Sequence, residues 1–189
     1  DRLPPQSRRL NRVVDKLLLA ANMQAGASPT VALAAVEVAP ALERVAASYT
    51  AVAPLHEFVV DAPGDMVVRG DAKAVGQILD QLVDNAVKYS PEGGVVRLSA
   101  RRTRSRVEIV VEDEGVGLPP DIRAIFDAFT QGEEVNRRVH DEGGVGVGLY
   151  IVRQLCEQLG GSVRAERRAR GARFVVTLRA SQARALARV

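Results

Sequence analysis

The sequence of 189 residues has no tryptophan, two histidines and a single cysteine. One cysteine, Cys156, excludes an internal disulfide and favours a reducing compartment. Its place in the apolar-periodic stretch 149–159 predicts a buried structural thiol rather than a reactive one. Cys156, His56 and His140 are scattered along the chain and do not have the spacing of a metal site.

Long apolar runs are also missing. No stretch approaches the roughly 18 apolar residues needed to span a bilayer, and nothing resembles a signal peptide. We therefore expect a cytoplasmic domain without membrane contact of its own, although its parent protein could be membrane-anchored. The chain starts at Asp1 without an initiator methionine, which indicates a piece of a longer protein.

Positive charge is in slight excess, with a net charge of +3 and a pI of about 9.4. Two arginine-rich stretches, 97–106 and 164–173, carry most of it. Neither is interleaved with aromatic residues, and both alternate with strand-forming residues. They are therefore predicted to lie on the solvent face of a sheet, and we expect no nucleic-acid partner.

The chain divides into three parts. Residues 1–29 hold a predicted helix at 7–24, with apolar residues at helical spacing, and a Gly-Ala-Ser-Pro linker signal. We expect a globular domain at 30–180 and a tail at 181–189 that frays.

Helix and strand signals follow one another through the predicted domain. Asp71 is a candidate N-cap for a long helix. This order predicts an α+β fold, a two-layer α/β sandwich with a mixed, mostly antiparallel sheet, preceded by the N-terminal helix. The expected helices are 38–52, 72–89 and 147–159, and the expected strands are 57–61, 66–69, 95–100, 107–112, 163–166 and 173–178. The loop of about thirty residues before the last helix is unusual in a compact domain and indicates function.

Polar residues form one face of the predicted helix 72–89. Gln81, Asn85 and Lys88 stand at positions i, i+4 and i+7. The Asn85 carboxamide can reach a hard cation such as Mg²⁺, the Lys88 ammonium can meet phosphate, and Tyr89 offers a ring beside them. Taken alone, the pattern fits a solvated polar helix face slightly better.

Two glycine-rich stretches flank the long loop. Asp113 directly follows a predicted strand and precedes Gly115 and Gly117, so its carboxylate could accept a hydrogen bond from an exocyclic amine such as that of adenine. An ordinary acidic turn explains this stretch equally well. The second stretch, 143–148, has four glycines at the start of a helix, where free amides and the helix dipole favour phosphate. It lacks the lysine of a P-loop.

Together these stretches resemble the sensor histidine kinases and their wider ATPase superfamily, which includes DNA gyrase, heat-shock chaperone ATPases and mismatch-repair ATPases. Residues 82–91 resemble the kinase N box, 113–117 the G1 box, 125–129 the F box and 144–152 the G2 box. The resemblance covers roughly residues 36–178.

The resemblance implies a site for ATP and Mg²⁺. Asn85 would hold the Mg²⁺ that bridges the phosphates, Asp113 would read the adenine amine, and residues 126–143 would form a lid over ATP, anchored by Phe126 and Phe129 packing inward. The implied nucleotide-binding residues are Asn85, Lys88, Tyr89, Asp113, Gly115, Gly117, Phe126, Phe129, Gly144, Gly146, Gly148 and Leu149.

Gln81 bears on the reaction. The ATPases of the superfamily resemble one another in having a general-base glutamate there, and a carboxamide cannot take a proton from water at neutral pH. With Asn85 and Lys88 as the other catalytic candidates, phosphotransfer is favoured over hydrolysis. Two departures from the kinase pattern, Val145 in place of a small hydroxyl residue and Gln81 in place of asparagine, leave open an ATPase or a degenerate binding module without transfer activity.

The resemblance also implies the partners. In these kinases the phosphate acceptor is a histidine on the first helix of a dimerisation hairpin, and we expect that helix to be absent from this chain. Residues 7–24 resemble the last part of the second helix of that hairpin, so residues 1–29 are expected to be a partial dimerisation-hairpin helix and a linker. His56 is predicted to start a strand and His140 to lie in the lid, so neither is expected to be that acceptor. Expected partners are the acceptor helices of the parent kinase, a response regulator, and a second copy in a full-length homodimer.

Overall fold

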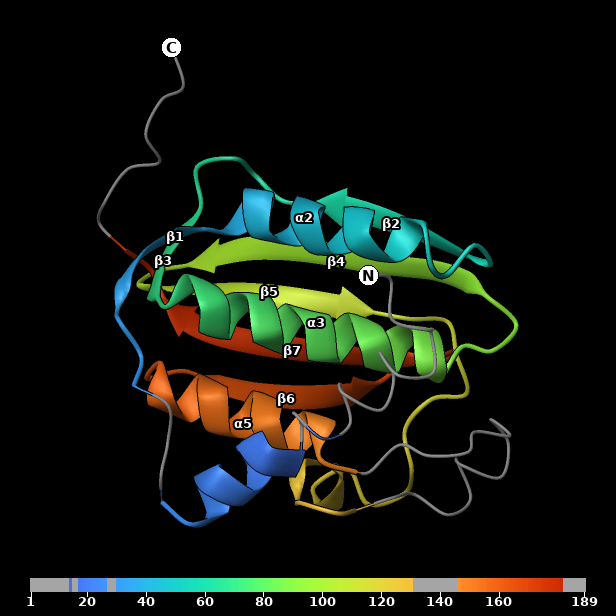
Figure 1. Cartoon of the computed structure of the whole chain (residues 1–189). Helices are drawn as coiled ribbons and strands as arrows, with labels where there is room; N and C mark the ends of the chain where they lie inside the picture. The colour runs from blue at the N-terminus through green and yellow to red at the C-terminus, as the bar shows by residue number, and fades with distance from the viewer. Residues whose placement is uncertain (1–13, 15–16, 27–29, 131–145, 182–189) are drawn as a thin grey trace, which may run out of the picture.

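One five-stranded sheet with three helices packed on one of its faces makes up most of the computed structural model (Figure 1). The strands are β2 (His56–Asp61), β4 (Gly94–Thr103), β5 (Arg106–Glu112), β6 (Ser162–Arg167) and β7 (Ala172–Arg179), and the helices are α2 (Val38–Thr50), α3 (Ala72–Lys88) and α5 (Gly148–Gln158). The sheet order is β2-β4-β5-β7-β6. β2 and β4 run parallel, and the other three pairs are antiparallel. The predicted α+β sandwich is thereby confirmed.

The structure describes residues 14, 17–26, 30–130 and 146–181. Within these residues, the predicted helices and strands are present and their ends differ by a few positions at most. No helix in this part of the chain is both long enough and apolar enough to cross a membrane.

The core lies between the helices and the sheet. In β5, Val107, Ile109 and Val111 point to the core at alternate positions and are at most 1% exposed. In α3, the apolar stripe includes Leu79 and Leu82, which are equally buried. The strand period of two and the helix period of 3.6 therefore bring apolar side chains to the same interior.

The long helix α3 begins at a well-formed cap. One carboxylate oxygen of Asp71 accepts hydrogen bonds from the backbone amides of Lys73 (2.9 Å) and Ala74 (3.0 Å). Its other oxygen accepts one from the Ala32 amide at 2.9 Å. The predicted N-cap is confirmed, and Asp71 also ties the incoming chain to the helix.

A small second sheet, which sequence reasoning missed, closes one end of the molecule. It pairs β1 (Ala34–Glu37) with β3 (Val67–Gly70) in antiparallel fashion. On the other edge of β3, Val68 forms a bridge to Ala180, and the Ser181 amide donates to the Val67 carbonyl at 2.8 Å. A four-residue strand with two alanines carries little period-two signal, which is why β1 escaped prediction.

The segment before this sheet contains a short helical stretch at residues 17–24, which lies beside α5 in Figure 1. Ala20 and Met23 are buried in the main core, whereas Leu18 is 58% exposed. The predicted helix 7–24 is therefore confirmed over its second half. Its first half, apart from Val14, lies outside the described residues, and the division of the chain into three parts stays a prediction.

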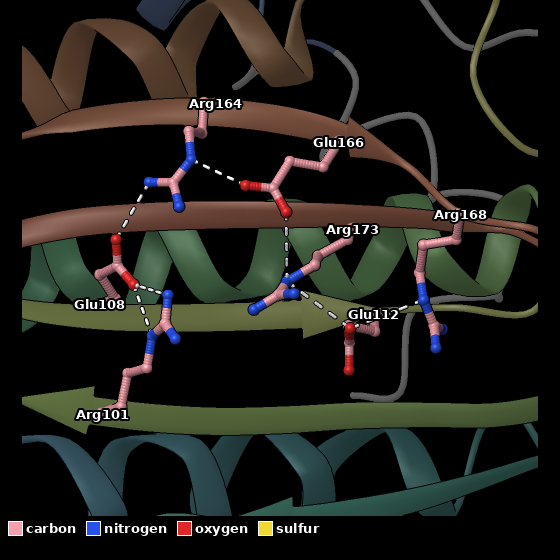
Figure 2. A network of polar contacts seen from close by, with 7 residues as sticks. All are labelled: Arg101, Glu108, Glu112, Arg164, Glu166, Arg168 and Arg173. Carbon is pink, nitrogen blue, oxygen red and sulfur yellow. Dashed lines mark hydrogen bonds and ion pairs between the residues drawn. The ribbon is translucent and has the colours of Figure 1, made fainter.

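Charged side chains cover the sheet face opposite the helices (Figure 2). A chain of ion pairs crosses β4, β5, β7 and β6, and we call it the charged ladder; its residues are Arg101, Glu108, Glu112, Arg164, Glu166, Arg168 and Arg173. The prediction that both arginine-rich stretches face solvent is thus confirmed for the residues of the ladder. Beneath it, Val110 and Val175 are cross-strand partners and are at most 2% exposed.

Candidate functional site

The end of α3 meets the loop after β5, so two of the predicted motifs are in direct contact. The Val116 amide donates to the Tyr89 carbonyl at 2.9 Å. A methyl group on Gly115 would lie 2.0 Å from that carbonyl and 2.5 Å from the Ser90 hydroxyl oxygen. Only glycine allows this approach, which explains the residue type at position 115.

Asp113 lies at the bottom of this junction. Its side chain is 3% exposed, and its Oδ1 accepts hydrogen bonds from the amides of Gly115 (2.9 Å) and Ala172 (3.1 Å). Within the described residues, Oδ2 accepts no hydrogen bond. Burial raises the pKa of Asp113, while the two amides and the charge of Arg168 act in the opposite direction. The carboxyl group is therefore fixed by one oxygen and has the other available.

Gly171, which sequence reasoning did not single out, packs against Asp113. Its φ is +77°, and a methyl group there would lie 1.9 Å from the Asp113 carbonyl oxygen and 2.8 Å from Oδ1. The carbonyl of the next residue, Ala172, accepts a hydrogen bond from the Asp113 amide at 3.0 Å, and the Ala172 amide donates to the Asp113 side chain. A lone glycine between two predicted strands is common, so the sequence offered no functional signal for this position.

The polar face of α3 points toward the start of α5. Gln81 is 8% exposed, and a methyl group on Gly148 would lie 3.0 Å from its Oε1. Asn85 and Lys88 follow one and two turns later on the same face, toward Asp113. The structure thus places the polar face of α3 between the first turn of α5 and the loop after β5.

The side chains on this face differ in their contacts. Asn85 is half-buried, and its carboxamide makes no hydrogen bond within the described residues. The Lys88 ammonium lies 5.0 Å from the centre of the Tyr89 ring. An amide oxygen is a ligand that Mg²⁺ accepts, so Asn85 fits a magnesium site in which phosphates supply further ligands. In the described part of the chain, no cluster of three His, Cys, Asp or Glu residues could hold a metal.

The start of α5 has amide donors that no side chain caps. Val147 is the N-cap and forms no side-chain cap hydrogen bond. Gly146, with φ +71°, turns the chain into the helix, and Leu149 packs against the core from the first turn. Free amides at the positive end of a helix dipole favour an anion. Gly144 lies outside the described residues, as does most of the predicted lid.

The two aromatic residues of the predicted F box differ in environment. Phe126, in the short 3₁₀ helix η1 (Ala124–Phe126), is 8% exposed and belongs to the core, as predicted. Phe129 is 57% exposed with φ +62°, so the prediction that it packs inward is wrong. Its amide donates to the Gly146 carbonyl at 2.9 Å, and this backbone bond rather than a buried ring fixes its position.

Two of the three side chains for which the sequence predicted no reactive role, His56 and Cys156, lie in regular elements of the structure. His56 begins β2, and its Nε2 lies 2.9 Å from the Ser90 carbonyl, which can only accept, so Nε2 donates. Cys156 is fully buried in α5, and burial raises the pKa of its thiol to about 12. The expected structural thiol is confirmed. His140 lies outside the described residues.

Comparison with known proteins agrees with this geometry. The family described as histidine kinase-, DNA gyrase B- and HSP90-like ATPases matches residues 70–182. The chain is similar to the sensor-like histidine kinase SenX3 of Mycobacterium tuberculosis, with 38% identity over 109 residues, 57% of this chain and 26% of SenX3. It is also similar to the sensor protein DivL of Caulobacter vibrioides, with 46% identity over 101 residues, 53% of this chain and 12% of DivL.

Solved structures show the same fold. Full-length ShkA in complex with AMPPNP superposes with a TM-score of 0.80 at 28% identity, covering 98% of this chain and 41% of ShkA. The mycobacterial sensor histidine kinase MprB superposes with a TM-score of 0.68 at 25% identity, covering 79% of this chain and 98% of that structure. The chain therefore spans about a quarter or less of the two curated relatives, whereas its match to the MprB structure covers nearly all of that structure.

Proposed function

This chain belongs to the family of histidine kinase-, DNA gyrase B- and HSP90-like ATPases, and we propose that it is the ATP-binding catalytic domain of a two-component sensor histidine kinase. The observation that carries the proposal is the convergence of three elements: the polar face of α3, the buried Asp113 and the uncapped start of α5. Asp113 suits the base, and the polar face of α3 and the start of α5 suit the phosphates and their Mg²⁺.

The base would be recognised at Asp113. Because Oδ1 is held by two backbone amides, Oδ2 has a fixed direction in which it can accept a hydrogen bond from the adenine amine. Gly115 and Gly117 would let the backbone of the loop approach the base closely, and Tyr89 lies beside Gly115 at the end of α3. Guanine has a carbonyl oxygen where adenine has this amine, so the same carboxylate would repel it.

The phosphates would lie between α3 and α5. Lys88 supplies a positive charge, and the amides of Gly146 and of the first turn of α5, which begins at Gly148, supply donors. Gly144 would add another. Bound Mg²⁺ would neutralise phosphate charge, with the Asn85 carboxamide as its ligand from the protein. Phe126 would anchor the start of the lid, and Phe129 would border it.

The reaction would move the γ-phosphoryl group to a histidine on a dimerisation helix of the parent kinase. The bond from the γ-phosphorus to the bridging oxygen breaks, ADP leaves, a phosphorus–nitrogen bond forms, and the imidazole loses its proton. His56 does not suit this role because its Nε2 is engaged with Ser90 in β2. A response regulator would then accept the phosphoryl group, and the full-length kinase would act as a homodimer with this domain in the cytoplasm.

Gln81 favours transfer over hydrolysis. Its carboxamide lies beside the first turn of α5, where a general base would have to act on water, and it cannot accept a proton at neutral pH. We therefore expect slow ATP hydrolysis by the chain on its own.

The test is a calorimetric titration of the chain with Mg-ATP, followed by transfer of labelled phosphate to a separately supplied helical hairpin that carries the acceptor histidine. We expect saturable binding, a loss of at least roughly tenfold in affinity for Asp113→Asn, and label on the hairpin. Binding without transfer would leave a degenerate nucleotide-binding module, and steady release of phosphate would indicate an ATPase. No binding at all would refute the proposal.

Asp113→Asn is suited to this test because it should not unfold the protein. Burial raises the folded pKa of Asp113 above its usual 3.8, so the ionised carboxylate costs stability at neutral pH, and this cost disappears as the pH falls below that value. Asparagine keeps the acceptor oxygen and removes the charge. We expect the variant to be at least as stable as the parent chain at pH 7, measured by urea unfolding.

A further inference from the structure

The turn between β6 and β7 lies along the loop that follows β5, which we call the G1 loop (113–120). Gly171 leaves room for Asp113, and a methyl group on Gly117 would lie 3.5 Å from the Gly171 carbonyl oxygen. The Arg170 Nε donates to the Glu114 carbonyl at 3.0 Å. The turn and the loop thus touch at several points, although about fifty residues separate them in the sequence.

Arg167, the last residue of β6, contacts the far end of the G1 loop. Its Nη1 donates to the carbonyl of Leu118 at 3.1 Å. Its Nη2 donates to the carbonyls of Pro119 at 2.6 Å and Pro120 at 2.9 Å. Three consecutive carbonyls therefore converge on one guanidinium group.

The residue types explain this arrangement. Pro119 and Pro120 have no amide hydrogen, so this stretch cannot fix itself through its own backbone donors. An arginine has five donors in a planar fork and stays charged at every accessible pH. A lysine at the same place would present a single nitrogen on a flexible stem, whereas Arg167 uses two nitrogens held in a rigid fork.

We propose that Arg167 is a positioning residue for base recognition: it holds residues 118–120 and thereby keeps Asp113 and Gly117 in the geometry that selects adenine. This inference rests on the proposed function, because it concerns the same nucleotide site. Arg167 acts through the loop and touches neither the base nor the phosphates. Its hydrogen bonds are exposed, so we expect a moderate effect on affinity and a clear one on selectivity.

The experiment compares Arg167→Met, Arg167→Gln and the matched control Arg164→Met in the full chain. Arg164 lies in the same strand and is also exposed, but its partners are Glu108 and Glu166 on the charged ladder. The Kd values of Mg-ATP and Mg-GTP are measured for each protein by calorimetry at 25 °C, and the unfolding midpoint is measured by urea.

For Arg167→Met we expect a Kd for Mg-ATP higher by roughly tenfold and a smaller preference for ATP over GTP, with Arg167→Gln intermediate because its amide keeps donors for one carbonyl. Arg164→Met should keep both values within about twofold of the parent chain. A loss of folding alone would not change the preference of the folded fraction for ATP. If Arg167→Met is too unstable to titrate, the inference is tested on the Kd values of Mg-ATP and Mg-GTP for Arg167→Gln.

Unchanged ATP affinity and unchanged preference in the Arg167 variants would overturn the inference, as would an equal loss in Arg164→Met, since that would mean a general effect of surface charge. The proposed function is judged separately, on the parent chain. If that chain binds no Mg-ATP, the proposed function fails before Arg167 is tested.

Discussion

At the scale of single residues, the site is shaped by contacts that exclude a side chain. The carbonyl of Tyr89 occupies the space beside Gly115, and the carbonyl of Asp113 occupies the space beside Gly171. Both contacts join the G1 loop to another element, so the same atoms that hold the fold also bring the nucleotide-binding groups together. Stability and binding should therefore respond together to substitution at these two positions.

Gly115→Ala tests this link. Because its methyl group would lie 2.0 Å from a backbone oxygen, the loop must move away from α3. We expect a loss of about 2–4 kcal/mol in the free energy of unfolding, in the upper range for single substitutions, together with weaker Mg-ATP binding. Urea unfolding and calorimetry measure the two effects.

Gly76→Ala is the matched control. Gly76 lies within α3, and a methyl group there would meet nothing within 4 Å. Alanine is the better helix former, so this variant should be more stable by about 0.5–1 kcal/mol and bind Mg-ATP like the parent chain. Equal losses in both variants would show that the contact between Gly115 and Tyr89 has no special role.

Sequence reasoning predicted some residues of the site and missed others for a physical reason. Asp113 and Gln81 were found because their residue types carry chemistry at a recognisable spacing. Gly171 and Arg167 were missed because their roles depend on a strand pair formed across some fifty residues. The inward packing expected of Phe129 was wrong: its ring is 57% exposed, and its backbone is held by the hydrogen bond to the Gly146 carbonyl.

At the scale of elements, α3 connects the core to the site. Its buried stripe packs under the sheet, and its polar face runs from the start of α5 to the G1 loop. The sequence predicted this helix well because both faces repeat with the helical period. β1 was not predicted, because its place depends on pairing with β3 rather than on a local pattern.

Asp71→Ala tests how much the N-cap of α3 contributes to the stability of the protein. The cap hydrogen bonds to Ala74 and Lys73 and the bond from Ala32 would be lost, which should cost about 0.5–2 kcal/mol of unfolding free energy at pH 7. Asp71→Asn keeps an acceptor oxygen and should cost less. Urea unfolding of the three proteins measures both values.

The pH dependence gives a second test of the same cap. The hydrogen bonds from the amides of Ala74 and Ala32 lower the pKa of Asp71 below its usual 3.8. Its contribution is therefore present above that value and is lost as the pH falls through the folded pKa. The advantage of the parent chain over Asp71→Ala should stay constant from pH 7 to 5 and shrink below about pH 4. A constant difference at all pH values would contradict the role of the charge.

At the scale of the whole molecule, the helices cover only one face of the sheet, and the charged ladder covers the other (Figures 1 and 2). Glu108 accepts from Arg101 and lies 3.2 Å from Arg164, so it joins β4, β5 and β6. Val110 and its cross-strand partner Val175 are buried on this face of the sheet, although no helix covers it. The ladder thus replaces a second helical layer.

Glu108→Gln measures what the ladder contributes. Two ion pairs would be weakened, and we expect a loss of about 1 kcal/mol in the free energy of unfolding at 0.05 M salt, shrinking at 1 M salt where charges are screened within about 3 Å. Glu57→Gln is the control, because Glu57 is exposed on β2 and makes no ion pair with the described residues. A loss that does not depend on salt would point to packing instead.

The strand β3 has a mechanical consequence for the molecule. The chain that leads into β1 pairs with one edge of β3 at Val36, and the chain that follows β7 pairs with the other at Ala180, so these two segments lie about 10 Å apart across two strand spacings. A pulling force applied at Thr30 and Ser181 would load this three-strand seam before the five-stranded sheet. Tension transmitted along the chain would open the seam while the nucleotide site, at the far end of α3, kept its shape.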